Sequence, residues 1–288
     1  MLTVVGKPNA GKSTLLNRIV GEKLSIVSPK PQSTRDRVVG IHTADDTQII
    51  ILDTPGLLNP RYALQKAMRA TALAALADAD VILYLVDATT GEAEPLVEVA
   101  QLDTAPRAPV LLGFNKTDAI AGRARDELAQ QHPDAVFLSA ATGAGVDALL
   151  ERIRGLLPES PYLYPEDDIS AQTVRFFVSE LIRETALEQL EDEVPYSIAC
   201  EVEEFRESQS PIYIRAVLHV ERESQKRILI GAGGARVRAI GKAARAKIEA
   251  FVGAPVYLDL WVKVLHNWRR NAVALSRFGY KLPEEESP

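Results

Sequence analysis

The sequence predicts an α/β domain with a mostly parallel, doubly wound sheet, followed by a smaller α+β domain. At 288 residues the chain is longer than one average domain. In its first half, runs such as IIIL and VILYLV are apolar at every position and alternate with helical segments, which is typical of strands buried on both faces of a parallel sheet. Later runs alternate apolar and polar residues. We expect a first domain at 1–157, a linker at 158–169, a second domain at 170–282 and a disordered tail at 283–288.

The expected elements follow from these runs in order. Those of the first domain are strands at 2–5, 47–54, 81–88, 109–116 and 135–140 and helices at 12–20, 63–79, 94–102, 121–131 and 146–156. Those of the second are a helix at 171–190, strands at 196–205 and 212–220, helices at 226–230 and 235–251, a strand at 256–264 and a closing helix at 267–280. Because ligands of such α/β sheets bind at the carboxyl ends of the strands, motifs in those loops should converge.

Composition and charge restrict the location of the protein in the cell and the kind of partner it binds. No run approaches the roughly 20 apolar residues that a membrane span needs, and the N-terminus does not read as a signal peptide. The single Cys200 fits a reducing cytosol, so we expect a cytoplasmic protein. The net charge is −6, yet residues 206–281 carry 15 Lys and Arg against 5 Asp and Glu. A basic second domain indicates a polyanionic partner.

The segment from Gly6 to Ser13 matches G-x-x-x-x-G-K-[ST] and lies between an apolar run and a helix, the setting that this phosphate-binding loop requires. Its glycines let successive N–H groups point at phosphate oxygens, and the positive end of the following helix adds to the attraction. Lys12 is expected to reach the β- and γ-phosphates, and Ser13 to bind Mg²⁺. The predicted contacts here are Gly6, Lys7, Pro8, Asn9, Ala10, Gly11, Lys12, Ser13 and Thr14.

Three further motifs each follow a buried run and predict a guanine nucleotide. Asp53 can hold the metal through water, and the Gly56 N–H can sense a γ-phosphate. Asp118 can accept hydrogen bonds from the N1–H and 2-amino groups of guanine, donors that adenine lacks, while the Lys116 stem covers the base. The third motif, Ser139-Ala140-Ala141, is placed to present backbone N–H groups to the guanine O6. The predicted contacts are Asp53, Thr54, Pro55, Gly56, Leu57, Asn115, Lys116, Thr117, Asp118, Ser139, Ala140 and Ala141.

A polar segment, Pro31 to Asp36, lies where a switch loop must supply a second hydroxyl to Mg²⁺. Thr34 is the preferred ligand and Ser33 the alternative, which gives Ser13, Thr34 and Asp53 as the metal set. A loop held only by the γ-phosphate and the metal is released on hydrolysis, and such a site is therefore a switch.

The second half contains a GxxG sequence between two expected helices, followed by a basic helix. A GxxG loop brings backbone close to a nucleotide backbone, beside a groove that admits single-stranded bases. The alternative is a glycine helix junction beside an ordinary solvated basic face. Four aromatic residues, Tyr257, Trp261, Trp268 and Phe278, are expected to pack internally rather than stack on bases. The predicted RNA contacts are Lys226, Arg227, Ile230, Gly231, Ala232, Gly233, Gly234, Arg236, Arg238 and Lys242.

With the spellings GKPNAGKS, PQSTRD, DTPGL and NKTD, nearly the whole chain resembles the Era family of bacterial GTPases, within the TrmE-Era-EngA-like group. The resemblance implies a P-loop GTPase domain followed by a type II KH domain. It also implies a monomeric, cytoplasmic ribosome-assembly factor that binds GTP and GDP, the small (30S) ribosomal subunit and the 3′ end of its RNA, with some peripheral membrane association. The alternative from the residues alone is a GTP-gated signalling switch that docks on a membrane or a protein.

Two departures affect these expectations. The GxxG holds Ala232 and Gly233 where many family members have Lys or Asn, so phosphate clamping falls to Arg236 and Lys226. At the place where Ras-like switches have a water-orienting Gln stands Leu57, which cannot hydrogen-bond.

The catalytic set is therefore Lys12, Thr34 and Asn9. Asn9 resembles the asparagine that holds K⁺ in related GTPases, where the cation supplies charge that an arginine finger gives elsewhere. The alternative role for Asn9 is to close the turn of the loop.

Overall fold

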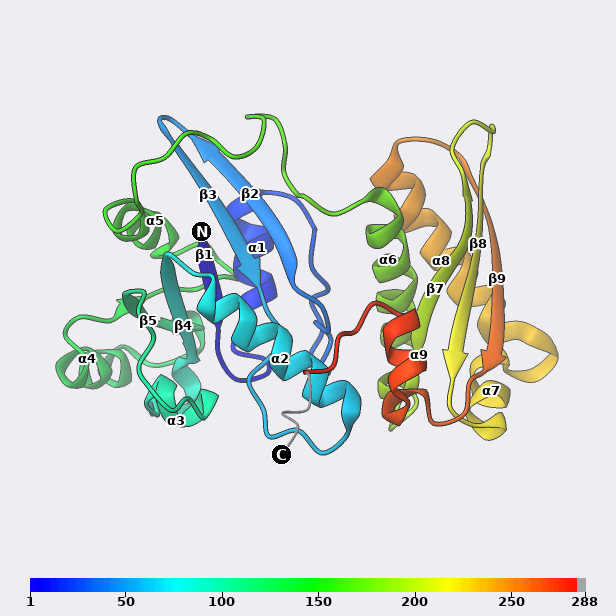
Figure 1. The fold of residues 1–288 in the computed structure, drawn as a ribbon, viewed down its shortest axis with the longest axis horizontal. Helices are drawn as coiled ribbons and strands as arrows, with labels where there is room; N and C mark the ends of the chain where they lie inside the picture. Colours follow the sequence, from blue (N-terminus) through cyan, green and yellow to red (C-terminus); the bar gives the residue numbers. More distant parts are fainter. Residues whose placement is uncertain (284–288) are drawn as a thin grey trace. The chain divides into compact units, whose positions relative to one another are not determined.

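The computed structural model describes residues 1–283, so residues 284–288 of the predicted tail lie outside the described part. By their contacts the residues form two compact units, one of residues 1–61 and 65–171 and one of residues 62–64 together with those from 172 on (Figure 1). Within residues 1–283, no helix is both long and apolar enough to cross a membrane.

The first unit is built on a six-stranded sheet of order β2-β3-β1-β4-β5-β6. All neighbouring pairs are parallel except β2 and β3, which form an antiparallel hairpin. This confirms the mostly parallel α/β prediction. The strands are β1 (Leu2–Val5), β2 (Val38–Ala44), β3 (Thr47–Asp53), β4 (Val81–Asp87), β5 (Val110–Asn115) and β6 (Val136–Phe137).

Helices cover both faces of this sheet (Figure 1). Buried residues of α2, α3 and α4 share one core with β1, β4 and β5, whereas α1 packs against β2 and β3. The central strands are apolar at nearly every position because both of their faces are buried. The helices are α1 (Lys12–Val20), α2 (Ala63–Ala77), α3 (Leu96–Ala100), α4 (Gly122–Gln131) and α5 (Val146–Arg154).

Strand β2 is the one element of the sheet that the sequence reading omitted. It lies at the edge of the sheet and pairs only with β3, through a tight turn at Asp45, whose φ is 52°. Its sequence, VVGIHTA, contains a glycine and two polar residues, so it lacks the continuous apolar character of the central strands. An edge strand needs less apolar surface, and for this reason the pattern was weak.

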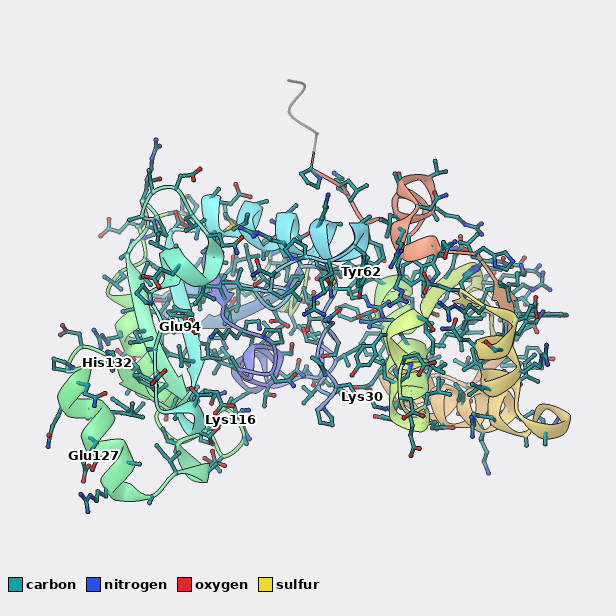
Figure 2. All side chains as sticks on the ribbon, turned by 90° about the horizontal axis from the view of Figure 1, so that it is seen from below. Lys30, Tyr62, Glu94, Lys116, Glu127 and His132 are labelled. Carbon is teal, nitrogen blue, oxygen red and sulfur yellow. The ribbon has the colours of Figure 1, made fainter. Side chains whose placement is uncertain are left out.

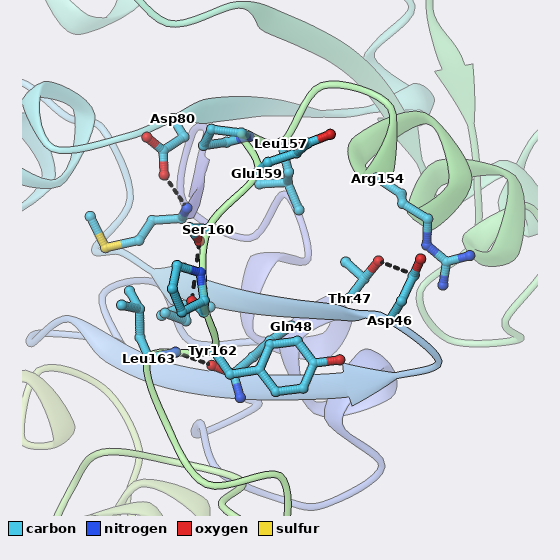
Figure 3. Close-up of a pocket in the computed structure, with 14 residues that line it drawn as sticks. Asp46, Thr47, Gln48, Asp80, Arg154, Leu157, Glu159, Ser160, Tyr162 and Leu163 are labelled. Atoms are coloured by element: carbon cyan, nitrogen blue, oxygen red, sulfur yellow. Dashed lines mark hydrogen bonds and ion pairs between the residues drawn. The ribbon is translucent and has the colours of Figure 1, made fainter.

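The segment predicted as a linker is hydrogen-bonded to this hairpin. The Gln48 Oε1 of β3 accepts from the N–H groups of Leu163 and Tyr164 at 3.0 Å, and its Nε2 donates to the Tyr164 carbonyl at 2.9 Å. Further along, the Ile41 N–H donates to the Ile169 carbonyl at 2.9 Å. Figure 3 shows this segment running over β3 above a pocket of about 350 Å³.

The second unit is an α+β fold on a three-stranded sheet of order β7-β8-β9, in which β8 pairs antiparallel with β7 and parallel with β9. Parallel strands need a crossover, and α7 and α8 supply it, so the GxxG sequence lies inside the crossover. One core joins α6, α7 and α8 to one face of the sheet. The elements are α6 (Val174–Gln189), β7 (Ala199–Arg206), β8 (Ile212–Val220), α7 (Glu223–Ile230), α8 (Ala235–Val252), β9 (Val256–Val264) and α9 (Ala272–Arg277).

The expectation for the four aromatic residues is wrong for two of them. Trp268 is fully buried, donates its indole N–H to the Ser197 carbonyl at 2.8 Å and contacts Phe278 edge to face. Tyr257 and Trp261, in contrast, are 58% and 54% exposed. They alternate with core-facing residues of β9 and so point to the sheet face opposite the helices.

Candidate nucleotide and nucleic-acid sites

The phosphate-binding loop lies between β1 and α1, and a cavity of about 350 Å³ opens over it, lined also by the switch segment, Gly56 and Lys116. Two glycines allow this close assembly. A Cβ on Gly11, whose φ is 97°, would lie 2.1 Å from the Asn115 Nδ2, and one on Gly56 would lie 2.7 Å from the Pro8 nitrogen. Both contacts are shorter than packed atoms tolerate, so only glycine brings these loops together.

Lys12 and Asp53 form the charged centre of the cavity. Lys12 is 6% exposed and Asp53 is fully buried. Burial lowers the pKa of Lys12 to about 8, against the opposing charge of Asp53. Burial likewise raises the pKa of the Asp53 carboxyl, against the charge of Lys12 and a hydrogen bond from Ser13. Both groups are therefore destabilised in their charged forms, which an anion near Lys12 and a cation near Asp53 would reverse.

Three oxygen-bearing side chains meet beside this pair. The Ser13 hydroxyl donates to the Asp53 Oδ2 at 2.6 Å and lies 2.8 Å from the Thr34 hydroxyl. The Asp53 Oδ1 is buried and accepts no hydrogen bond from any residue in the described range. Hydroxyl and carboxylate oxygens are the ligands that Mg²⁺ prefers, so the set fits this ion. Among residues 1–283 no cluster of three or more His, Cys, Asp or Glu could hold a metal, and phosphate oxygens or water must complete the shell.

Asn115, at the end of β5, ties the phosphate loop to the third guanine loop. Its Nδ2 donates to the Ala10 carbonyl and its Oδ1 accepts from the Ala140 N–H, both at 2.8 Å. The side chain is 2% exposed, so both bonds are shielded from water. One residue thus fixes the spacing between the phosphate end and the base end of the site.

Lys116 and Asp118 follow directly. Lys116 adopts a left-handed backbone conformation, with φ at 64°, and its ammonium (labelled in Figure 2) lies 2.6 Å from the Asp87 carboxylate. Asp118 is exposed within a short 3₁₀ turn, Thr117–Ala119. The Thr117 N–H donates to the Leu138 carbonyl at 3.2 Å, which holds this turn against the loop that begins at Ser139.

Asp87 is a site residue that the sequence reading missed. Its Oδ1 accepts from the Thr89 N–H and hydroxyl at 3.0 and 2.7 Å, and its Oδ2 accepts from Lys116. Burial alone would raise the pKa of Asp87, but the hydrogen bonds from Lys116 and Thr89 outweigh it and lower that pKa. The signal was present in the sequence, since Asp87 ends the run VILYLV as Asp53 ends QIIIL.

Several residues that were predicted to contact the nucleotide have side chains that are engaged elsewhere. The Lys7 ammonium is paired with Glu94 (labelled in Figure 2), so that residue offers the site its backbone alone. The Thr54 hydroxyl donates to the Val4 carbonyl at 2.8 Å. Leu57 is 3% exposed and belongs to the core beneath α2 and α3, so its side chain cannot orient water at the phosphates. The predicted residues that line the cavity are Pro8, Asn9, Gly11, Lys12, Ser13, Thr14, Gly56 and Lys116, and Ala140 and Ala141 line a neighbouring cavity.

Asn9 connects the phosphate loop to the chain just before the switch segment. Its Nδ2 donates to the Pro29 carbonyl at 3.0 Å, and its φ is 64°. Neither predicted role included this bond. Because the amide nitrogen is the donor, the carbonyl oxygen of Asn9, the atom that a K⁺ ion would need, is left out of the contact.

In the second unit the GxxG loop joins α7 to α8 through a 3₁₀ turn, Ala232–Gly234. Five basic side chains lie in this loop or in the two helices that it joins. None of the five forms an ion pair with a carboxylate of the described residues. Other basic residues of the same unit do form such pairs, namely Arg215, Arg245, Lys247 and Arg269. Arg236 donates to the Ile228 carbonyl at 2.9 Å, which caps α7 with part of its guanidinium. The five are Lys226, Arg227, Arg236, Arg238 and Lys242.

Comparisons with known proteins match both units of the chain. A family model described as 50S ribosome-binding GTPase matches residues 1–116, and one described as KH domain matches residues 193–269. GTPase Era of Carboxydothermus hydrogenoformans is 42% identical, with 97% of this chain and 96% of that protein covered. The chain belongs to the GTPase Era family. GTPase Era of Pseudomonas aeruginosa is 43% identical over 97% of this chain and 94% of that protein.

Two solved Era structures match over 98% of each chain, at 40% identity and a TM-score of 0.90. One is a variant of Aquifex aeolicus Era bound to GDP·AlF4⁻, and the other is Era in complex with MgGDPNP and nucleotides 1506–1542 of 16S ribosomal RNA. Membership of the Era family confirms the predicted fold and the GTPase activity, with a P-loop GTPase domain followed by a KH domain.

Proposed function

We propose that this GTPase binds Mg²⁺ and GTP in the cavity over its phosphate loop and couples that site to RNA bound at its GxxG loop. The observation that carries the nucleotide half is the Ser13 hydroxyl held between Thr34 and Asp53. Ser13 and Thr34 ligate the ion directly and Asp53 through water, while Lys12 contacts the β- and γ-phosphates. The ion neutralises charge on the phosphates, and the MgGDPNP complex of the related Era supports this assignment.

Thr34 is proposed over Ser33 as the switch ligand because its hydroxyl lies 2.8 Å from that of Ser13 and is buried. Replacing Thr34 by Ala should therefore weaken Mg²⁺-dependent binding of a GTP analogue while leaving GDP affinity nearly unchanged. Ser33→Ala is the matched control. Equal losses of GTP-analogue affinity in the two variants would contradict the choice of Thr34 over Ser33 as the ligand.

Among the described residues that line the cavity, none carries a carboxylate or imidazole that could act as a general base, and the Leu57 side chain lies in the core. Positive charge must compensate, and the proposed sources are Lys12 and a K⁺ ion at the Asn9 carbonyl oxygen. Turnover of saturated enzyme should fall when Na⁺ replaces K⁺, and Asn9→Ala should abolish that dependence. Identical turnover in the two salts would leave Asn9 with its bridge to Pro29 as its role.

The second half of the proposal is that the GxxG loop binds single-stranded RNA at the 3′ end of small-subunit ribosomal RNA, in assembly of that subunit. Unpaired cations around a glycine loop attract phosphates, and the related Era binds nucleotides 1506–1542 of 16S ribosomal RNA. The direct test is a titration with that RNA 3′ end, with a duplex of equal length as control. A preference for the single strand that rises with a GTP analogue over GDP is expected, and equal binding of the duplex would refute the assignment.

We further propose that the protein acts as a monomer in the cytoplasm, with a peripheral association at the inner face of the cell membrane. The location in the cytoplasm is supported by the 16S ribosomal RNA that the related Era binds. Sedimentation at micromolar concentration measures the mass in solution, and flotation with anionic vesicles measures the membrane association. A dimer, or a protein that stays at the bottom of the gradient, would contradict the corresponding part.

A further inference from the structure

Arg18, in the last turn of α1, reaches the loop that begins at Ser139. Its Nε donates to the Ala140 carbonyl at 3.1 Å, and its Nη2 donates to the Ala141 carbonyl. We propose that Arg18 is a positioning residue for guanine recognition, which aims the Ala141 N–H at the guanine O6. The inference rests on the proposed nucleotide site and adds a residue outside its four motifs.

The geometry of the peptide bond carries this step. In a trans peptide the carbonyl of one residue and the N–H of the next point in opposite directions. Because Arg18 holds the Ala140 carbonyl, the Ala141 N–H must point away from Arg18. Fixing the Ala141 carbonyl as well leaves the loop little freedom to rotate that peptide.

The other donors of the loop are already engaged. The Ala140 N–H is donated to the Asn115 Oδ1 at 2.8 Å, and the Thr142 N–H to the Ser139 hydroxyl at 3.1 Å. No residue in the range 1–283 accepts a hydrogen bond from the Ala141 N–H. Of these three consecutive donors, Ala141 is thus the one that offers its proton to a ligand.

A second cavity lies at this loop. It measures about 460 Å³, its lining includes Thr14, Arg18, Ala140 and Ala141, and Thr14 also lines the phosphate cavity. Helix α1 therefore holds the phosphate lysine at its first residue and the loop at its last turn. Arg18 is exposed, but hydrogen bonds from a guanidinium to a carbonyl are about twice as strong as neutral ones, so we expect both bonds to persist.

The test compares two ligands that differ at one atom. In 6-thio-GDP, sulfur, a poor acceptor, replaces O6, and both donors that face Asp118 remain. Wild-type protein should bind GDP more tightly than 6-thio-GDP at neutral pH. Arg18→Met should weaken GDP about tenfold, the value of one well-placed hydrogen bond, and 6-thio-GDP less than about twofold, so that the preference nearly disappears.

Arg18→Lys, with one donor nitrogen for two carbonyls, should fall between these values. Arg123→Met is the matched control, because Arg123 on α4 is 91% exposed and its one ion pair within residues 1–283 is with Glu127 (labelled in Figure 2). Amide exchange of residues 139–144 should accelerate in Arg18→Met alone. Equal weakening of the two ligands, or no weakening, would overturn the role of Arg18. Failure of the wild type to bind GDP would instead overturn the proposed nucleotide site.

Discussion

The nucleotide site and the GxxG site differ in how their parts are held. Lys12, Asp53 and Asn115 are nearly inaccessible to water and come from distant segments of the chain. Hydrogen bonds between these segments connect them. The cations at the GxxG loop lie within residues 226–242, and most are exposed.

This difference predicts two kinds of recognition. The buried Asn115 fixes the loops beside the base, so the exposed Asp118 should meet the base donors in one fixed position and the first site should discriminate between bases sharply. Exposed cations attract phosphates through a field that salt screens, so the second site should depend on ionic strength. Four measurements, from the largest expected effect to the smallest, test this contrast.

The largest effect is expected from Asp118→Asn. The amide loses the acceptor that takes the guanine 2-amino group, and GTP affinity should fall about 10²-fold or more. Xanthosine triphosphate, with a carbonyl at that position, should gain affinity in the variant. Competition with a fluorescent nucleotide measures both. Asp126→Asn, an exposed carboxylate of α4, is the control, and unchanged GTP affinity in Asp118→Asn would refute the guanine assignment.

A change of about tenfold is expected from Asp87→Asn, because the Lys116 ammonium loses a charged partner at 2.6 Å and its stem is no longer fixed over the base. GDP and inosine diphosphate should weaken alike, since the stem covers either base. A double-mutant cycle with Lys116→Met measures the coupling. If the two losses simply add, Asp87 does not act through Lys116.

At the GxxG site a few-fold effect is expected from Lys242→Gln. RNA affinity should weaken, and the slope of log affinity against log salt should fall by about 0.7, the value for one phosphate contact on a single strand. Arg245→Gln is the control, because Arg245 lies on the same helix and is paired with Glu249. GDP affinity should be unchanged in both. An unaltered slope in Lys242→Gln would exclude that contact.

The smallest expected effect is the number of protons that the protein takes up when GDP binds. Because the pKa of Lys12 is lowered to about 8, about half of the unliganded protein lacks that proton at pH 8. A bound phosphate raises the pKa again, so GDP binding without Mg²⁺ should take up about half a proton there. Calorimetry in buffers of different ionisation enthalpy measures this uptake. Lys12→Arg, which stays charged, should show none, and equal uptake in that variant would assign the proton elsewhere.

Much of the nucleotide site was predictable because its chemistry lies in short contiguous motifs. Lys12, Ser13, Asp53 and Asp118 each follow a recognisable apolar run, and these runs form parallel strands of one sheet whose carboxyl ends lie at the same edge. Asp87 was missed because a single carboxylate at a strand end has no motif around it. The exposure of Tyr257 and Trp261 was missed because alternation alone does not say which face of a sheet the helices cover.

The sequence by itself determined the fold class, the order of most elements and the type of ligand, because apolar periodicity and phosphate-loop chemistry are local properties of the chain. Tertiary structure alone decided the edge strand β2, the burial of Leu57, the bridge from Asn9 to Pro29 and the bonds from Arg18 and Asp87 to the base loops. Each of these joins residues far apart in sequence. Such contacts depend on how whole elements pack, and no short window of residues records that.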